Sequence, residues 1–374
     1  MSTSTAEDDV EGLERPTGDG WGDYPLDSVF VRTENRTVSS VVERIENHRY
    51  ILDPDFQREF VWSPEKQSKL IESCVMRIPL PVFYVAEADD GRIIVVDGLQ
   101  RLTSFSRFLA GDLRLTGLSK GQTTAARSTL EGRTFSELPL NLQERVQDTQ
   151  LTMYILDVKA PERARLDIFE RVNSGEPLTR QQMRNALYNG VGTQWLKEAA
   201  SSSLFLDATG GSLDRKAMRD REAINRFCAF KLLGQKSYTS GDMDTFLAQG
   251  LRRLTKLSDK ERAALRSGFD SALELNRELF QTHAFRRSLA STDLSPRHTP
   301  INISLFEVCT VNMFGLSKQF NAESKRKLHD GLIALIRENE IFQRAISYST
   351  NSTQPVAVRF AALERLVSET GSQC

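Results

Sequence analysis

The sequence predicts an α+β protein, with a domain built around a small sheet followed by an all-α helical domain. Up to about residue 190, β-branched and aromatic runs alternate with apolar residues at helical spacing. Beyond that point the β-branched runs give out and helical periods take over, as at Ile224, Phe227 and Cys228. A chain of 374 residues also suggests two cores. We therefore expect the sheet domain at residues 28–190 and the helical domain at residues 191–374.

The first 27 residues form an acidic segment. They hold eight acidic side chains against one basic side chain, Arg15, and they lack an apolar period. We therefore expect residues 1–27 to be a disordered tail. Because the formal net charge of the whole chain is −1, the remainder is mildly basic. Such a surface permits contact with phosphates without demanding it.

The sequence favours a cytoplasmic protein without membrane contact. Its first residues lack the basic and apolar regions of a secretory signal. Residues 301–316 are the most apolar stretch, but Asn302, Glu307 and Asn312 interrupt a segment that is too short to cross a bilayer. We expect a buried helix there.

Two helices are predicted at the start of the sheet domain. Apolar residues between positions 38 and 45 recur at helical spacing after Thr37, a suitable N-cap. A second helix is expected to begin where Ser63 can cap and Pro64 suits the first helical position, and to end near Arg77.

A hairpin and a third helix come next. Residues 79–85 and 92–96 are β-branched and aromatic runs that flank an Asp-Asp-Gly turn. The second run leads directly into Asp97 and Gly98, and a helical period then continues to about Gly111. The predicted order is strand, tight turn, helix.

The sheet domain closes with one more strand and two helices. Residues 149–158 read as a strand and residues 161–172 as a helix. Thr179 and Gln182 have the spacing of a capping box, which predicts a further helix to about Tyr188.

Residues 97–101, Asp-Gly-Leu-Gln-Arg, are the strongest candidate for a functional site. A strand that ends in glycine at the start of a helix exposes N–H groups, and these groups and the helix dipole attract anions. Gly98 permits close approach of a phosphate, Arg101 offers a planar fork of donors, and Asp97 has the chemistry to hold a metal ion or orient water. The alternative is a tight turn in which Asp97 caps the helix and Arg101 pairs with a surface acid.

Two further stretches offer polar residues. Gln57 and Arg58 lie between aromatic residues on an extended segment, where they either line the same pocket or accompany aromatic residues that merely pack. Asn173, Ser174 and Gly175 lie in a polar loop between two predicted helices, which either presents them to a ligand or only turns the chain.

Together these three stretches resemble the Phe-Gln-Arg, Asp-Gly-Gln-Gln-Arg and Asn-Ser-Gly motifs of the N-terminal family of GmrSD-type restriction endonucleases. The resemblance covers about residues 35 to 310 and includes residues 183–187, 218–222 and 302–307. Leu99 stands where the family usually has glutamine, so we expect its side chain to pack rather than bind. The Gly-x-x-Arg core from Gly98 to Arg101 is kept.

The resemblance implies a ParB/sulfiredoxin-like domain with a small mixed sheet, in which a Gly-x-x-Arg turn contacts nucleotide phosphates. It also implies nucleotide-stimulated defence against modified phage DNA. Complete members carry a separate HNH nuclease domain, which needs clustered histidines on a ββα hairpin. We expect this chain to lack one, because His298 lies in a predicted loop. Contact with DNA would then be direct or through a separate nuclease or defence subunit.

The resulting hypothesis is a nucleotide-binding and NTP-hydrolysing module of a bacterial anti-phage restriction system, with a helical domain that senses or relays contact with DNA or another defence protein. Asp97 and Gln100 are the candidate catalytic residues, and Asp97 is the candidate ligand for Mg²⁺. The candidate nucleotide-binding residues are Gln57, Arg58, Gly98, Arg101, Asn173, Ser174 and Gly175.

Two alternatives remain open. One is a ParB-like, metal-dependent DNA nuclease or nickase that uses Asp97. The other is a regulator that binds nucleotide or DNA and catalyses nothing. The sequence does not determine the nucleotide, the DNA modification or the oligomeric state, and it is compatible with an oligomer.

Overall fold

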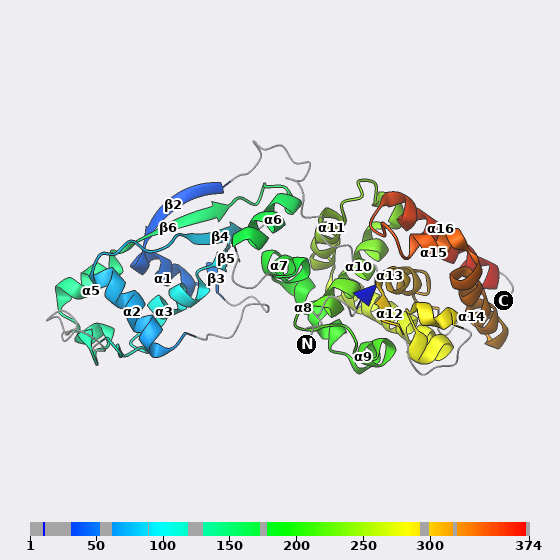
Figure 1. Ribbon diagram of the computed structural model, residues 1–374, viewed down its shortest axis with the longest axis horizontal. Helices are drawn as coiled ribbons and strands as arrows, with labels where there is room; N and C mark the ends of the chain where they lie inside the picture. The colour runs from blue at the N-terminus through cyan, green and yellow to red at the C-terminus, as the bar shows by residue number, and fades with distance from the viewer. Residues whose placement is uncertain are drawn as a thin grey trace, which may run out of the picture. The chain divides into compact units, whose positions relative to one another are not determined.

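The computed structural model describes most of the chain as two compact units (Figure 1). The sheet unit comprises Trp21–Leu178 and Met183–Leu187, and the helical unit comprises Met1–Gly20, Thr179–Gln182 and Tyr188–Cys374. The described residues are 10–11, 31–52, 62–88, 90–118, 130–172, 178–291, 299–316 and 320–371.

The α+β class is confirmed, with a small mixed sheet in the first part of the chain and helices after it. The sheet has five strands in the order β2-β6-β4-β5-β3. The β2–β6 and β4–β5 pairs are antiparallel, whereas β4–β6 and β3–β5 are parallel. The strand bounds are β2 Val31–Thr37, β3 Tyr50–Ile51, β4 Phe83–Glu87, β5 Ile93–Asp97 and β6 Gln150–Leu156. The predicted hairpin is therefore confirmed as β4–β5.

Strand β2 was not predicted, and its sequence explains why. Its positions Arg32, Glu34 and Arg36 pair with the core residues of β6, so apolar and polar residues do not alternate along it. Ion pairs rather than apolar contacts hold these side chains, since Arg32 pairs with Glu34 at 3.1 Å and with Glu87 at 3.0 Å. A period-2 hydrophobic pattern cannot reveal such an edge strand.

The helices of the sheet unit begin largely where their caps predict. The N-cap Thr37 accepts the Ser40 N–H, and Ser63 accepts the Lys66 N–H with Pro64 next to it. The helices are α1 Val38–Glu46, α2 Pro64–Val75, α3 Leu99–Leu109, α5 Leu140–Gln147 and α6 Glu162–Val172, with a short 3₁₀ helix at Phe135–Glu137.

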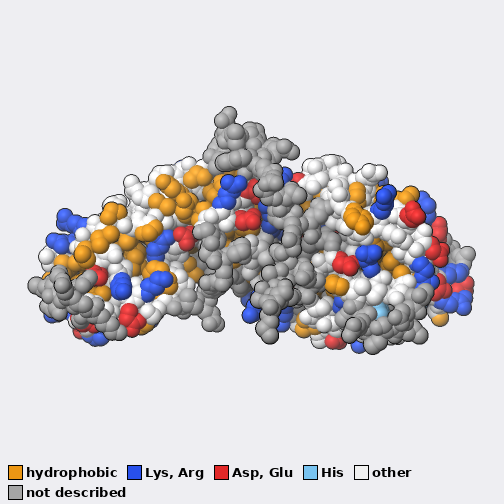
Figure 2. Space-filling view, in the orientation of Figure 1, with side chains coloured by type: hydrophobic (Ala, Val, Ile, Leu, Met, Phe, Trp, Pro, Cys, Tyr) orange, Lys and Arg blue, Asp and Glu red, His pale blue; other side chains and the backbone are white. Residues whose placement is uncertain are grey.

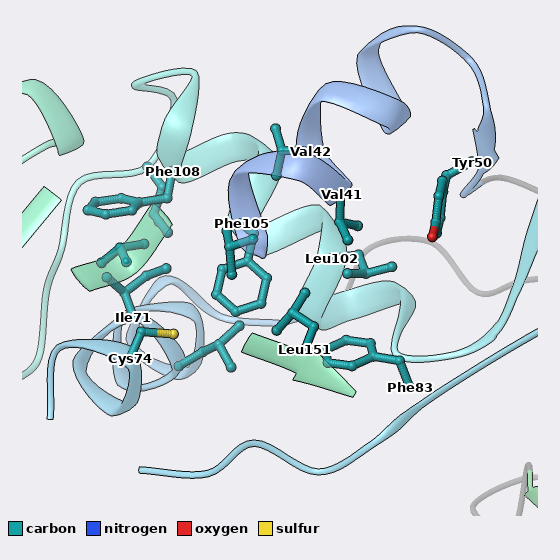
Figure 3. Packing of buried hydrophobic residues seen from close by; sticks show 14 of the residues in the cluster. Val41, Val42, Tyr50, Ile71, Cys74, Phe83, Leu102, Phe105, Phe108 and Leu151 are labelled. Atoms are coloured by element: carbon teal, nitrogen blue, oxygen red, sulfur yellow. The ribbon is translucent and has the colours of Figure 1, made fainter. Parts of the chain in front are cut away.

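The core of the sheet unit lies between the sheet and α1, α2 and α3. Figure 3 shows Phe83 and Leu151 from the sheet directed towards Leu102 and Phe105 of α3. These four side chains are fully buried. Leu99, at the start of α3, packs against the same cluster, as expected from its departure from the family motif. The core therefore fixes α3 on the strand that precedes it.

The helical unit consists mainly of helices. Thr179 and Gln182 form the predicted capping box of α7, Arg180–Leu187. The other helices are α8 Val191–Ala200, α9 Ser203–Thr209, α10 Arg219–Leu233, α11 Met243–Thr255, α12 Asp259–Phe280, α13 Ile303–Asn312, α14 Ala322–Glu338, α15 Glu340–Ala345 and α16 Thr353–Gly371, with 3₁₀ turns at Gln235–Ser237, Gln281–His283 and Arg287–Ala290.

Helix α13 is the buried helix expected between residues 301 and 316. None of the helices that the structure describes is long and apolar enough to cross a membrane. The face of the helical unit drawn in Figure 2 carries basic and acidic side chains together.

The acidic segment is described at two residues only. Val10 and Glu11 form strand β1, which pairs in parallel with β7, Ile301–Asn302. The structure differs from the expected disorder at this point, because the backbone of β7 offers hydrogen-bonding partners that a local sequence pattern does not reveal. The rest of residues 1–27 lies outside the described residues.

Candidate functional site

The candidate site begins where β5 ends. Gly98 has a φ of 107° and is the N-cap of α3, so the predicted order of strand, tight turn and helix is confirmed. A Cβ atom at Gly98 would overlap the ring of Phe83. Glycine is therefore required twice, for its left-handed backbone and for the close approach of the ring.

Arg101 is largely enclosed by partners at the start of β4 and just before it. Its Nη1 donates to the Pro81 carbonyl oxygen, and its Nη2 donates to the Val82 carbonyl oxygen at 3.1 Å. The guanidinium carbon lies 4.0 Å from the centre of the Phe83 ring, as a cation–π contact. Burial lowers the pKa of Arg101, and the charge of Asp97 opposes that effect. Arg101 thus fastens α3 to the chain that enters β4.

Asp97 is the acidic partner of Arg101. Arg101 Nη2 donates to Asp97 Oδ2 at 2.9 Å, with the side chains 11% and 45% exposed, respectively. The alternative in which Asp97 caps the helix is wrong, because Gly98 occupies the N-cap and makes no side-chain cap bond. The same alternative also paired Arg101 with an acidic side chain. That ion pair is present, and Asp97 is the acidic partner.

Gln100 faces the start of α2. Its Oε1 accepts the Trp62 N–H at 3.2 Å, and Gln67 Nε2 donates to the Trp62 carbonyl oxygen at 2.9 Å. The ring of Trp62 also carries Lys66 Nζ at 4.5 Å from its centre. Gln100 thereby holds the backbone that follows residues 53–61. Its expected catalytic role stays a prediction.

Five of the expected site residues lie outside the described residues: Gln57, Arg58, Asn173, Ser174 and Gly175. The chain on both sides of residues 53–61 is held near the turn. Before that segment, β3 pairs in parallel with β5. After it, Trp62 bonds to Gln100.

Asp97, Gly98, Gln100 and Arg101 are the expected residues that the structure brings together, all on one strand–helix junction. Among the described residues, no group of three His, Cys, Asp or Glu side chains is placed to hold a metal ion. Asp97 is a half-exposed carboxylate at the junction.

Phe83 and the carbonyl groups of Pro81 and Val82 were not predicted as part of this site. They surround the Arg101 side chain, although they lie 18 to 20 positions before it in the sequence. The hairpin register contained a usable signal, because Tyr84 pairs with Asp97 across the β4–β5 ladder. Counting outward from the predicted turn would have placed Phe83 opposite Asp97, and a register shift between Tyr84 and Val85 changes that pairing by one residue.

The fold and this junction define an α+β domain with a Gly-x-x-Arg turn between a central strand and a helix. Residues 38–189 match the family model of the GmrSD restriction endonuclease, N-terminal domain, so this part of the chain is similar to that family. The matched segment contains β4, β5, α3 and every residue of the candidate site. No match was found among the curated proteins with which the chain was compared.

Proposed function

We propose that residues 38–189 bind and hydrolyse a nucleoside triphosphate as part of a bacterial anti-phage restriction system that acts on modified DNA. The match to a restriction endonuclease domain supports the biological setting. The junction between β5 and α3 supports the ligand class.

The observation that carries this proposal is the left-handed Gly98 at the N-cap of α3. Having no side chain, Gly98 cannot cap the first N–H groups of the helix. The positive end of the helix dipole adds to the attraction of an anion. Arg101 lies in the first turn of the same helix with a charged fork of donors. A phosphate group has the charge and the acceptors that this arrangement suits.

In this proposal Gly98 and Arg101 bind phosphates, and the polar residues of the two other motifs complete the pocket. The residues assigned to that second role are Gln57, Arg58, Asn173, Ser174 and Gly175. Asp97 and Gln100 position the attacking water or a magnesium ion. Catalysis of phosphoryl transfer rests mainly on such positioning and on charge neutralisation.

Magnesium suits a site with one protein carboxylate. Mg²⁺ is commonly bound through one or two carboxylates together with the phosphates of its nucleotide. Asp97, with 45% of its side chain exposed, fits as that ligand. The ion would neutralise charge on the phosphates, and Asp97 would hold it beside the turn.

A second candidate is a nucleotide-binding regulator that catalyses nothing. The contact of Gln100 with the Trp62 N–H favours it, because this oxygen is then engaged with the backbone rather than directed to a water molecule. In both candidates, the helical unit relays contact with DNA or with a separate nuclease or defence subunit.

The deciding experiment is a screen of nucleoside triphosphates for binding and for multiple-turnover phosphate release, with and without modified DNA. Hydrolysis that is lost in Asp97→Ala and kept in Asp90→Ala supports the enzyme, since Asp90 lies in the hairpin turn before β5 and accepts a hydrogen bond from Arg92. Binding without turnover supports the regulator. If no nucleotide binds under any condition, the proposal is wrong.

A parallel assay tests the nuclease alternative. The purified chain is incubated with supercoiled plasmid and Mg²⁺, and we expect no cleavage to completion. Robust cleavage that disappears in Asp97→Ala would place the ParB-like nuclease first.

A further inference from the structure

The Arg101 guanidinium already binds an anion from its own chain. Asp97 Oδ2 accepts from Nη2 at 2.9 Å. Carboxylate and phosphate oxygens compete for the same donors, because both accept charge-assisted hydrogen bonds from a guanidinium group. A phosphate that approaches Arg101 therefore meets an occupied donor.

The three hydrogen-bonding partners of Arg101 differ in how readily they can leave. The Pro81 and Val82 oxygens belong to the backbone that leads into β4, so neither can turn away by a side-chain rotation. Asp97 is held by a short side chain that is 45% exposed, whereas the Arg101 side chain is 11% exposed. Rotation about the Asp97 side-chain bonds is enough to move its carboxylate into solvent. The charged partner is thus the exchangeable one.

We propose that Asp97 is an internal competitor for nucleotide phosphate, which occupies Arg101 in the ligand-free chain and is displaced when a polyphosphate binds. The proposal rests on the proposed function, because it concerns the same phosphate site. Displacement leaves the two backbone carbonyl bonds and the stacking on Phe83 intact. Arg101 is therefore positioned before the ligand arrives, and only its anionic partner changes.

The exchange has a consequence for ligand choice. A ligand must be attracted to Arg101 more strongly than the carboxylate that it replaces. A triphosphate carries more negative charge than a monophosphate and is therefore favoured. The displaced Asp97 is then released beside the bound phosphates. That is the position in which the proposed function requires a carboxylate for magnesium or water.

The test is a set of calorimetric titrations without divalent cations, in EDTA, with ATP, GTP, AMP, GMP and inorganic tripolyphosphate as the probes. Asp97→Asn keeps the size of the side chain and removes the competing charge. We expect it to bind at least one triphosphate or tripolyphosphate roughly tenfold more tightly than the parent, which is the scale of one charge-assisted hydrogen bond. We also expect its preference for triphosphate over monophosphate to fall.

Two controls separate competition at Arg101 from a general change of charge. Asp90→Asn removes the same charge in the hairpin turn before β5, where the carboxylate bonds Arg92, and we expect its affinity to match that of the parent. In an Arg101→Gln background, we expect Asp97→Asn to give little further gain, because the contested donor is gone. If Arg101→Gln does not fold, the comparison with Asp90→Asn decides alone.

The outcomes are distinct. If the parent binds a triphosphate and Asp97→Asn binds it equally or less tightly, Asp97 is not a competitor and the inference is wrong. An equal gain in Asp90→Asn also overturns the inference, since the effect would then be general. If neither the parent nor Asp97→Asn binds any probe in these titrations or in a repeat with Mg²⁺ in place of EDTA, the proposed phosphate site itself fails.

Discussion

Each of the two units holds an arginine against a carboxylate, but the two arrangements differ in their access to solvent. In the helical unit, Glu307 pairs with Arg226 and Arg359, and the exposed fractions of these side chains are 0%, 2% and 0%. In the sheet unit, Arg101 is nearly as enclosed, but its partner Asp97 is 45% exposed. An enclosed network can only hold the fold, whereas an open pair can exchange its anion.

The network of the helical unit is also the more extensively bonded. Arg359 donates to Glu307 Oε1 through Nε at 2.8 Å and to the Thr350 carbonyl oxygen at 2.7 Å. Arg226 donates to Glu307 Oε2 at 3.2 Å. Removal of one partner from a buried network leaves charges without compensation, which costs more than the pair contributes. The comparison therefore predicts a graded series of effects.

The largest effect on stability is expected for Glu307→Ala. It leaves two buried guanidinium groups without their shared acid, and we expect the free energy of unfolding to fall by about 3–5 kcal/mol. Urea denaturation of the full chain followed by circular dichroism measures this. Glu338→Ala, at an exposed acid of α14, is the control and should have little effect. If Glu307→Ala lowers the free energy of unfolding no more than Glu338→Ala does, the comparison between the enclosed network and the open pair loses its basis.

Arg101→Ala should be the next most severe. It leaves the Pro81 and Val82 carbonyl oxygens without this donor and removes the contact with Phe83, so we expect a loss of about 2–4 kcal/mol. If Arg101 binds phosphate, the variant should also bind nucleotide roughly ten- to a hundredfold more weakly. Arg101→Lys keeps the charge without the planar fork and should rescue neither property fully. Lower stability with unchanged nucleotide affinity would make Arg101 a structural residue alone.

Gly98→Ala tests the backbone on which Arg101 depends. A methyl group there meets a left-handed φ and the Phe83 ring, and we expect a loss of about 2–3 kcal/mol. Gly91→Ala is a matched control, because Gly91 also has a positive φ but a Cβ there meets no described atom within 4 Å. The difference between the two variants isolates the contact with the ring. Equal melting temperatures for both would show that the ring gives way.

The smallest effect on stability is expected for Asp97→Asn. A half-exposed ion pair contributes at most about 1 kcal/mol, and added salt should reduce the difference from the parent. Thermal melts at low and high ionic strength measure both quantities. If Asp97→Asn destabilises as much as Glu307→Ala, Asp97 is a fixed structural partner and exchange with a phosphate is ruled out.

Local features of the chain were predictable where one segment contains all the determinants of its own structure. The cap at Ser63 followed by Pro64, the β4–β5 hairpin and the capping box at Thr179 are such cases. Strand β2 was missed because ion pairs, within the strand and with Glu87, hold its charged residues on positions where a hydrophobic pattern expects apolar residues. The strand at Val10 was missed because its partner is Ile301.

The sequence by itself determined that a strand, a glycine and a helix with an arginine in its first turn follow one another at residues 93–109, since backbone preference and periodicity act over a few residues. The tertiary structure decided what Arg101 contacts. Phe83 and the Val82 carbonyl reach Arg101 through the pairing of β4 with β5 and the packing of α3 on the sheet. Arg101 therefore has a buried structural environment and one exchangeable acid, and this depends on strand register and burial, which no short segment encodes.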